Sequence, residues 1–240
     1  MTVALILQAR MSSKRLPGKI LKKIDGKSIL QHCIDRCEHI QGVDKHVLAI
    51  PDDENSEIIT HNTDLKSFSV FLGPEDNVLE RYIGSQKAVG AETTLRVTAD
   101  CPVLDSVVCS KMLEYFQEYR FDYLANGSPR TFPHGFDCEI FKSALLEEHP
   151  PNALDSYARE HVTPWIKSQN INKFNFTTAQ LSIPYDYSKL RFVVDTTDDL
   201  KRLKWFFEEP HAVCKLENFS IDTLLGLNND WERHLSTASI

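Results

Sequence analysis

Short apolar runs and segments with helical spacing alternate along the first half of the chain. Runs at 3–7, 47–50, 69–72 and 93–98 carry few charges and have the length of strands buried in a parallel sheet. Helical spacing of apolar residues follows Ser28, a typical N-cap, and continues to Cys37. Further helices are expected over 54–65, from 76 or 77 onward, and over 106–119 and 199–208, with a short one near 221–225. This order predicts right-handed crossovers and an α/β fold with a mostly parallel sheet.

Residues 126–190 interrupt this pattern with several prolines and short elements. A strand is expected over 121–125 before the interruption, and a loop over 132–138 enters another strand near Glu139. The chain returns to the sheet with a strand over 189–194 that ends at Asp195. We therefore predict one domain over residues 1–240, with an inserted lobe at about 126–190.

Positive charge is concentrated at the start of the chain. The first 27 residues hold seven Lys or Arg against the single acid Asp25, although the whole chain has a net charge of −7. A basic loop after the first strand lies where an open α/β sheet places an anionic ligand. Arg10 and Arg15 offer planar donor forks for phosphate, and Lys19 offers a point charge. The spacing is not that of a Walker loop, and a solvated basic loop stays an alternative.

Two aspartates follow predicted strands at the same edge. Asp100 ends the strand 93–98, and Asp195 ends the strand 189–194. Carboxylates beside a triphosphate are typical ligands of Mg²⁺, whereas an aspartate after a strand is often only a turn residue. Thr196 or Thr197 can cap the following helix, which leaves Asp195 available.

Composition excludes several classes of function. The six cysteines form no Cys-x-x-Cys pair, so we expect buried small side chains instead of a zinc or redox site. No apolar run reaches the ~20 residues of a membrane span. An acidic chain without a basic stripe beyond the first loop is not expected to bind nucleic acid. We expect a cytoplasmic protein.

The segment Gln8–Lys19 resembles the signature loop of the cytidylyltransferases that include CMP-KDO and CMP-acylneuraminate synthetases. The spore coat polysaccharide biosynthesis protein F group is the most similar, and segments 73–82, 96–102, 132–140, 156–165 and 189–200 match as well. The resemblance implies the three-layer α/β fold of nucleotidyltransferases and a loop that holds the phosphates of CTP. It implies nucleotide contacts by Gln8, Ala9, Arg10, Ser12, Ser13, Arg15, Lys19, Gly73, Asp76, Asn77, Val78 and Thr98.

The same resemblance implies the remaining roles. Asp100 and Asp195 would bracket one Mg²⁺, and Arg10, Arg15 and Lys19 would join them in catalysis. His134, Asp137 and Glu139 would contact the acceptor. The segment Arg159–Thr163 also matches, but the sequence offers no mechanism for it, and Glu160-His161 lacks a second histidine at zinc spacing.

The expected reaction joins CTP to an acidic sugar or sugar-like acceptor and releases pyrophosphate, in surface polysaccharide or glycan biosynthesis. A homodimer formed by the lobe is expected, and His134 or Arg130 would supply a cation for the acceptor. Three alternatives stay open: a nucleotide-sugar-dependent glycosyltransferase, a phosphonate cytidylyltransferase, and a non-catalytic nucleotide-binding subunit. The first usually needs Asp-x-Asp, for which Asp137-Cys138-Glu139 is the nearest sequence. The last would lack the metal carboxylates or Lys19.

Overall fold

The chain is built around one mixed sheet. The computed structural model describes residues 1–127, 129–148, 155–168, 178–183, 185–208 and 221–238. Within them the main sheet has the strand order β5-β4-β1-β6-β8-β7-β9. The parallel part consists of β1 (Val3–Gln8), β4 (Lys45–Pro51), β5 (Phe68–Gly73) and β6 (Thr93–Thr98). The expected mostly parallel α/β sheet is confirmed.

The other half of the sheet contains one reversed strand. β8 (Glu139–Lys142) pairs antiparallel with β6 and with β7 (Tyr123–Ala125), and β9 (Thr178–Gln180) runs parallel to β7. β8 and β9 belong to the segment that interrupts the regular strand and helix pattern, and β7 directly precedes it. A second, two-stranded sheet is formed by β2 (Lys23–Ile24) and β3 (Lys27–Ser28). The interruption in the sequence therefore contributes short strands that extend the sheet, and β8 is the antiparallel one.

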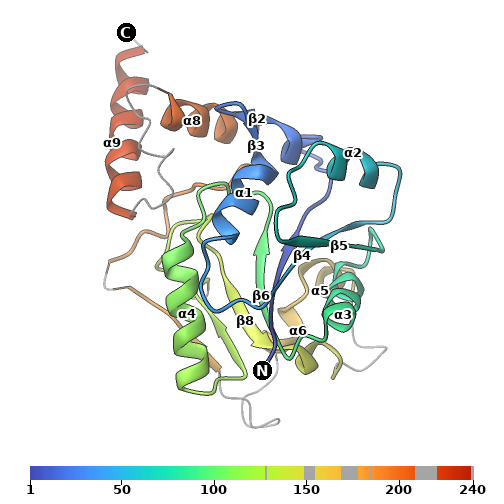
Figure 1. Cartoon of the computed structure of the whole chain (residues 1–240). Helices are drawn as coiled ribbons and strands as arrows, with labels where there is room; N and C mark the ends of the chain where they lie inside the picture. Colours follow the sequence, from blue (N-terminus) through green and yellow to red (C-terminus); the bar gives the residue numbers. More distant parts are fainter. Residues whose placement is uncertain (128, 149–154, 169–177, 184, 209–220, 239–240) are drawn as a thin grey trace.

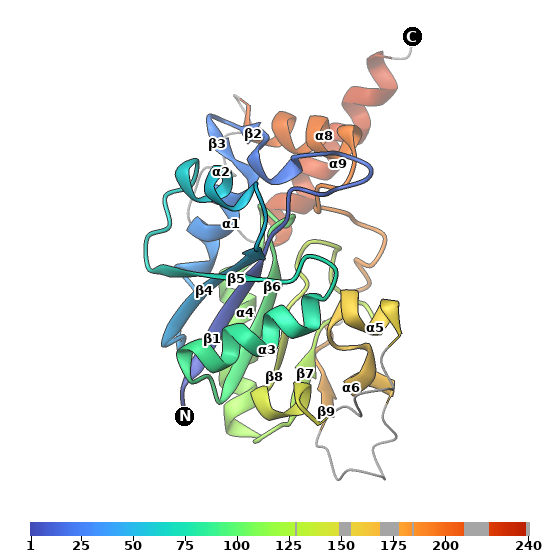
Figure 2. The ribbon, with the colours of Figure 1, turned by 90° about the vertical axis from the view of Figure 1, so that its right-hand side faces the viewer.

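Helices cover both faces of the sheet (Figures 1 and 2). One layer contains α1 (Ile29–Cys37) and α4 (Ser106–Glu118), and the other contains α3 (Val78–Val89), α5 (Ser156–His161) and α6 (Pro164–Ser168). In β1, Leu5 and Leu7 belong to the core on the α1 side, while Ile6 packs with Tyr82 of α3 on the other. The first apolar run is uninterrupted because both of its faces are buried.

Helix starts follow the predicted capping residues. The Ser28 hydroxyl accepts a hydrogen bond from Gln31 N at the start of α1, and the Asn77 side chain accepts one from Glu80 N at the start of α3. Thr196 and Asp199 form a reciprocal capping box at α8 (Thr197–Phe207). The helix expected over 54–65 is the shorter α2 (Ser56–His61).

Two predictions near the C-terminus are wrong. The segment 189–195 forms no strand of the sheet; Arg191 makes one isolated bridge with His134. The short helix expected near 221–225 is α9 (Ile221–Ala238), a long helix at the edge of the molecule (Figure 1). It continues because Leu224 and Leu227 are buried, and the Trp231 ring packs 5.5 Å from that of Trp205 on α8.

The strand order defines where a ligand binds. From β1 the chain proceeds outward through β4 to β5 and then crosses to β6 on the other side of β1. The carboxyl ends of β1 and β6 therefore flank the topological switch point, where open α/β sheets bind ligands. No helix of the described ranges is long and apolar enough to cross a membrane.

Candidate active site

The basic loop after β1 is folded back onto the sheet edge. The Met11 carbonyl accepts hydrogen bonds from Ser13 N (2.9 Å) and Gly18 N (3.0 Å), and Leu16 is buried beneath the loop. Gly18 has φ +64°, a left-handed conformation that favours glycine, and it precedes the 3₁₀ helix η1 (Lys19–Leu21). The turn leaves Arg15 exposed and brings both Arg15 and Lys19 to Asp195.

Lys19 lies between the two aspartates that the sequence singles out. Its Nζ atom is 2.8 Å from Asp100 Oδ2 and 2.8 Å from Asp195 Oδ1, and all three side chains are mostly buried. Burial alone would lower the pKa of the Lys19 ammonium, but Asp100 and Asp195 raise it overall. Burial would raise the pKa of the Asp195 carboxyl, yet Lys19 and its neighbours lower it. Lys19 and Asp195 are therefore both ionised at neutral pH.

An extended segment, not a sheet strand, brings Asp195 to Asp100. Val194 N donates to the Asp100 carbonyl at 2.8 Å, and Phe192 N donates to the His134 carbonyl at 2.7 Å. The two acceptors belong to different parts of the chain, so no continuous ladder forms. Gly135 has φ +103°, and a Cβ there would lie 2.8 Å from the Phe192 carbonyl carbon. Only glycine allows this close approach.

Further polar groups fix the two carboxylates. Thr98 Oγ1 donates to Asp100 Oδ1 at 2.6 Å, and Arg15 Nη2 lies 2.9 Å from Asp195 Oδ2. Arg191 bridges Asp195 and Asp199, the latter at 3.2 Å from Arg191 Nε. Each carboxylate therefore has several donors, and three cationic side chains surround Asp195.

A small cavity of about 80 Å³ lies beside Lys19. It is lined by Gln8, Ala9, Arg10, Lys19, Ile20, Thr98, Ala99 and Asp100, so it contains the predicted nucleotide residues at the ends of β1 and β6. Gln8 Oε1 is buried there without a hydrogen-bond partner within the described part of the chain. A buried polar atom of this kind is costly unless a ligand or water pairs with it.

The loop after β5 follows a different strand from the residues of the Lys19 cluster. β5 is two strands away from β1, and the loop is held from below by Arg81, whose Nη1 donates to the Pro74 carbonyl at 2.9 Å. Burial lowers the pKa of the Arg81 guanidinium, and nearby Arg10 contributes to the decrease. The Val78 side chain is buried in the core, so only its backbone is available to a nucleotide.

A second cavity of about 310 Å³ adjoins the aspartates. Its lining includes Asp100, Asp195 and the three predicted acceptor residues His134, Asp137 and Glu139. Burial lowers the pKa of His134, and Arg130 adds to this, so the imidazole is neutral at pH 7. Arg130 forms an ion pair with Asp137.

Glu139 is the most completely engaged of these carboxylates. Its carboxylate forms ion pairs with Arg96 Nη1 and with Lys167 Nζ at 2.6 Å. It also accepts hydrogen bonds from the Tyr123 hydroxyl at 2.7 Å and the Thr163 hydroxyl at 2.9 Å. Burial would raise the pKa of Glu139, but Arg96 and Lys167 outweigh it and lower the pKa to about 2. With this many donors, Glu139 holds two cations in the cavity wall.

The segment Arg159–Thr163 acquires a role from these contacts. Glu160 Oε1 lies 2.7 Å from Arg10 Nη2, and Thr163 donates to Glu139. α5 and the turn that follows it therefore connect Arg10 of the nucleotide loop to Glu139 of the acceptor cavity. Val162, which ends α5, is buried with φ +69°, an uncommon conformation for a β-branched residue.

Sequence reasoning missed Arg96, Lys167 and Arg191 as site residues. Arg96 had a signal, since it is the one charged residue in the strand 93–98 and a buried charge needs a partner. For Lys167 the sequence contains no such signal, because a lysine in a short helix ordinarily has a solvated side chain.

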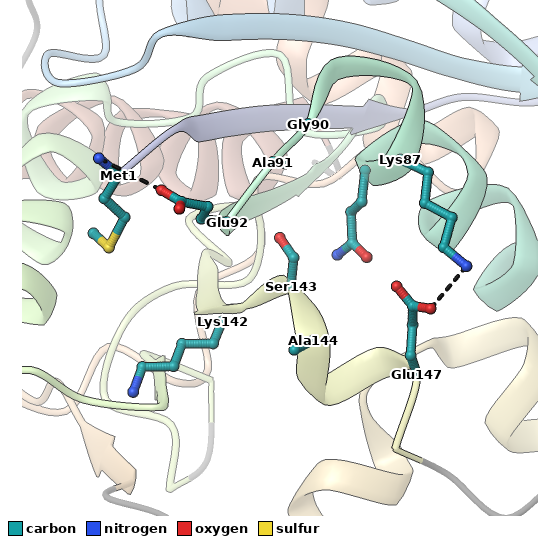
Figure 3. Close-up of a pocket in the computed structure, with 10 residues that line it drawn as sticks. Met1, Lys87, Gly90, Ala91, Glu92, Lys142, Ser143, Ala144 and Glu147 are labelled. Carbon is teal, nitrogen blue, oxygen red and sulfur yellow. Dashed lines mark ion pairs between the residues drawn. The ribbon is translucent and has the colours of Figure 1, made fainter.

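A larger, shallow pocket of about 760 Å³ lies at the opposite edge, near the start of β1 (Figure 3). Its charges form simple exposed pairs. Lys87 Nζ lies 2.7 Å from Glu147, and the N-terminal ammonium lies 3.5 Å from Glu92. No group of three or more His, Cys, Asp or Glu suited to a metal exists in the described ranges.

Five of the six cysteines are buried, as predicted. Cys33, Cys37, Cys101, Cys109 and Cys138 are free and buried, and Cys214 lies outside the described residues. Burial raises the pKa of the Cys37 thiol well above its ordinary value. The thiol is therefore protonated and unreactive at neutral pH.

Comparison with known proteins defines the family. Residues 4–219 match the model of a family described as cytidylyltransferase. This chain belongs to that family. The spore coat polysaccharide biosynthesis protein SpsF of Bacillus subtilis is 27% identical over 236 residues, which cover 95% of each chain. The chain is related to CMP-KDO synthetases.

Solved structures share the fold. A cytidylyltransferase from Leptospira borgpetersenii superposes with a TM-score of 0.84 at 29% identity, covering 97% of this chain and 96% of the other. A CMP-KDO synthetase complexed with CTP superposes with a TM-score of 0.60 at 14% identity, covering 85% of this chain and 97% of the other. A Mycobacterium tuberculosis protein in complex with manganese superposes with a TM-score of 0.57 at 12% identity, covering 85% of this chain and 98% of the other. At such low identity the last two support the fold alone.

Proposed function

We propose that this cytidylyltransferase transfers CMP from CTP to an oxygen of an acidic sugar or sugar-like acceptor and releases pyrophosphate, as a step in surface polysaccharide or glycan biosynthesis. One observation carries the proposal: Lys19 joins Asp100 and Asp195 at the switch point, between a phosphate-sized cavity and a sugar-sized one. Anionic phosphates and a second substrate would meet at this cluster.

The two aspartates fit a divalent cation. They are hard oxygen donors at a partly open edge, and the Lys19 ammonium shows that a cation is accommodated between them. Mg²⁺ is usually held by one or two carboxylates together with phosphate oxygens and water. Asp100 and Asp195 would hold it, and it would supply positive charge that neutralises the phosphates of CTP.

The chain's own residues would provide positioning and charge. The exposed Arg15 would bind the outer phosphates together with Lys19, while Gln8 and Thr98 border the space for the nucleoside side. The acceptor oxygen attacks the α-phosphorus, the bond to the bridging α,β-oxygen breaks, and pyrophosphate carries away the charge. Neutral His134 lines the acceptor cavity and would accept the proton of the attacking hydroxyl. Such transfers depend mainly on alignment and electrostatic stabilisation.

The roles of the single residues, the homodimer and the cytoplasmic location stay predictions. The loop residues Gly73, Asp76 and Asn77 would contact the nucleotide from the side of β5, and Ser12 and Ser13 would offer backbone donors. Sedimentation equilibrium of the purified chain would test the dimer. A mass close to 27.5 kDa would contradict it.

The reaction is tested by a coupled pyrophosphate assay with each of the four ribonucleoside triphosphates and Mg²⁺. KDO, sialic acids and simple phosphonates serve as acceptors. We expect release with CTP only when an acidic acceptor is present. Activity confined to UTP, or release of a nucleoside diphosphate from a nucleotide sugar, would contradict the proposal and favour a glycosyltransferase. Release with phosphonates alone would favour a phosphonate cytidylyltransferase.

A further inference from the structure

We propose that Lys167 and Arg96 bind the carboxylate of the acceptor, at the Glu139 wall of the 310 Å³ cavity. This inference rests on the proposed function and names the part of the site that selects a singly charged sugar acid. The nucleophilic oxygen of the acceptor would lie at the other side of the same cavity, toward Asp100.

The cations expected from the sequence are poorly suited to this task. Arg130 is already paired with Asp137, and burial together with Arg130 lowers the pKa of His134, which is neutral at pH 7. Arg191 faces both Asp195 and Asp199. An acceptor anion placed beside any of these would meet at least one carboxylate for each cation.

The Glu139 wall differs because its positive charges exceed its negative charges by one. Arg96 and Lys167 share the single carboxylate of Glu139. The Tyr123 and Thr163 hydroxyls donate to the same carboxylate and add no charge. At the other side of the cavity, Asp100 and Asp195 are paired with Lys19, Arg15 and Arg191, so the aspartate side has no comparable share of unpaired positive charge beside a single carboxylate.

The donors of this wall are available to a ligand. The Lys167 ammonium has three N–H groups and a half-exposed side chain, and one of the three is used by Glu139. Arg96 also lines the cavity, and its Nη1 atom is the one that donates to Glu139. Both residues also line a neighbouring cavity of about 450 Å³ that contains Tyr157 and His161. The two cations therefore stand where two cavities meet.

The excess of one charge favours a carboxylate over a phosphate group. A monoanion is neutralised by the surplus cation, whereas a dianion would retain a charge close to the carboxylate of Glu139, and repulsion between like charges in a buried site is strong. A cavity of about 310 Å³ is also at the small end of ligand sites, which suits a single sugar acid.

The test measures acceptor binding separately from turnover. Titration calorimetry of the full chain, with Mg²⁺ and a CTP analogue carrying an α,β-methylene bridge, compares KDO, N-acetylneuraminate and gluconate with their neutral carboxamides and with a hexose phosphate. Lys167→Met should weaken binding of the preferred acid at least about tenfold and leave its carboxamide unchanged. Glu139 keeps Arg96 in this variant, so the wall stays paired.

Lys142→Met is the matched control. Lys142 is also half-exposed and pairs with one carboxylate, Asp122 at 2.6 Å, but it lines the opposite pocket (Figure 3). The Lys142→Met variant should bind every acid with the same affinity as the unmodified protein. Equal losses for acid and carboxamide in Lys167→Met, no loss for either, tighter binding of the hexose phosphate, or no acid binding to the unmodified protein would each overturn the inference. Acid binding without pyrophosphate release would overturn only the proposed function.

Discussion

The two edges of the sheet each carry a charged pocket, and they use their charges differently. At the amino edge the pocket is larger, yet Lys87 and Glu147 form one exposed pair with side chains 61% and 47% accessible. At the carboxyl edge Lys19 is only 12% accessible and serves two aspartates. Exposed pairs contribute little and are screened by salt, whereas shared, partly buried charges retain their field.

The comparison shows that pocket size does not identify the site. At the carboxyl edge, one buried cation, Lys19, is shared by two aspartates, and Asp195 is shared by three cations. At the amino edge, each charge belongs to a separate, exposed one-to-one pair. If this difference is functional, substitutions at the carboxyl edge should affect catalysis, and matched substitutions at the amino edge should not.

The largest effect is expected from the aspartates. Asp100→Asn and Asp195→Asn should each lower kcat by about 10²-fold or more, because each removes a charge that would hold the metal and the phosphates. Thermal unfolding would show whether the fold is retained. The control Glu92→Gln, at the amino edge, should keep full activity. Turnover at the unmodified rate in the double Asn variant would rule out the two-carboxylate site.

Lys19→Met and Arg15→Ala should weaken CTP binding more than CMP binding. Charge-assisted bonds to phosphate contribute roughly 1.5 to 3 kcal/mol each, which corresponds to roughly a 10- to 150-fold loss. Fluorescence or calorimetric titration with both nucleotides measures the difference. Lys87→Met, the counterpart at the amino edge, should bind both nucleotides normally. Equal losses for CMP and CTP would mean that neither side chain reaches the outer phosphates.

The carboxyl edge should also make stability depend on pH. The pKa of Glu139 is about 2 in the folded chain and 4.5 in its unperturbed state, so the folded state favours the ionised form. Its contribution is present above pH 4.5 and is lost as pH falls toward 2, by roughly 3 kcal/mol in total. Urea unfolding between pH 3 and 6 gives the free energy of unfolding as a function of pH. As the pH falls, this free energy should decrease less steeply for Glu139→Gln than for the unmodified protein. An unchanged slope would show that the Arg96 and Lys167 pairs do not stabilise this carboxylate.

The smallest effect is expected at the amino edge. Glu147→Gln breaks the exposed pair with Lys87 and should change the free energy of unfolding by less than about 1 kcal/mol, with no change in pyrophosphate release. Urea unfolding and the coupled assay measure the two quantities. Loss of activity here would mean that the two edges are coupled, which no described contact indicates.

Local signals allowed much of the scaffold to be predicted. The apolar run 3–7 predicted β1 correctly because its residues are buried on both faces of the sheet. Ser28, Asn77 and Thr196 indicated helix starts because an N-cap side chain bonds to backbone within three residues of itself. The loop from Gln8 to Lys19 was identifiable because its charge and its family resemblance lie in one continuous stretch. The prediction for α9 failed because the helix is extended by packing on α8, which no local pattern contains.

The sequence by itself determined that the sheet is mostly parallel, and it singled out the phosphate loop and the two aspartates as candidates, since each of these signals depends on neighbouring residues. Tertiary structure alone decided that Val194 bonds to the Asp100 backbone without forming a strand, and that Lys19 joins both carboxylates. It also decided that Arg96, Glu139 and Lys167 form one wall. These side chains come from separate segments of the chain, and their contacts depend on how β6, β8 and α6 pack, which composition and periodicity do not encode.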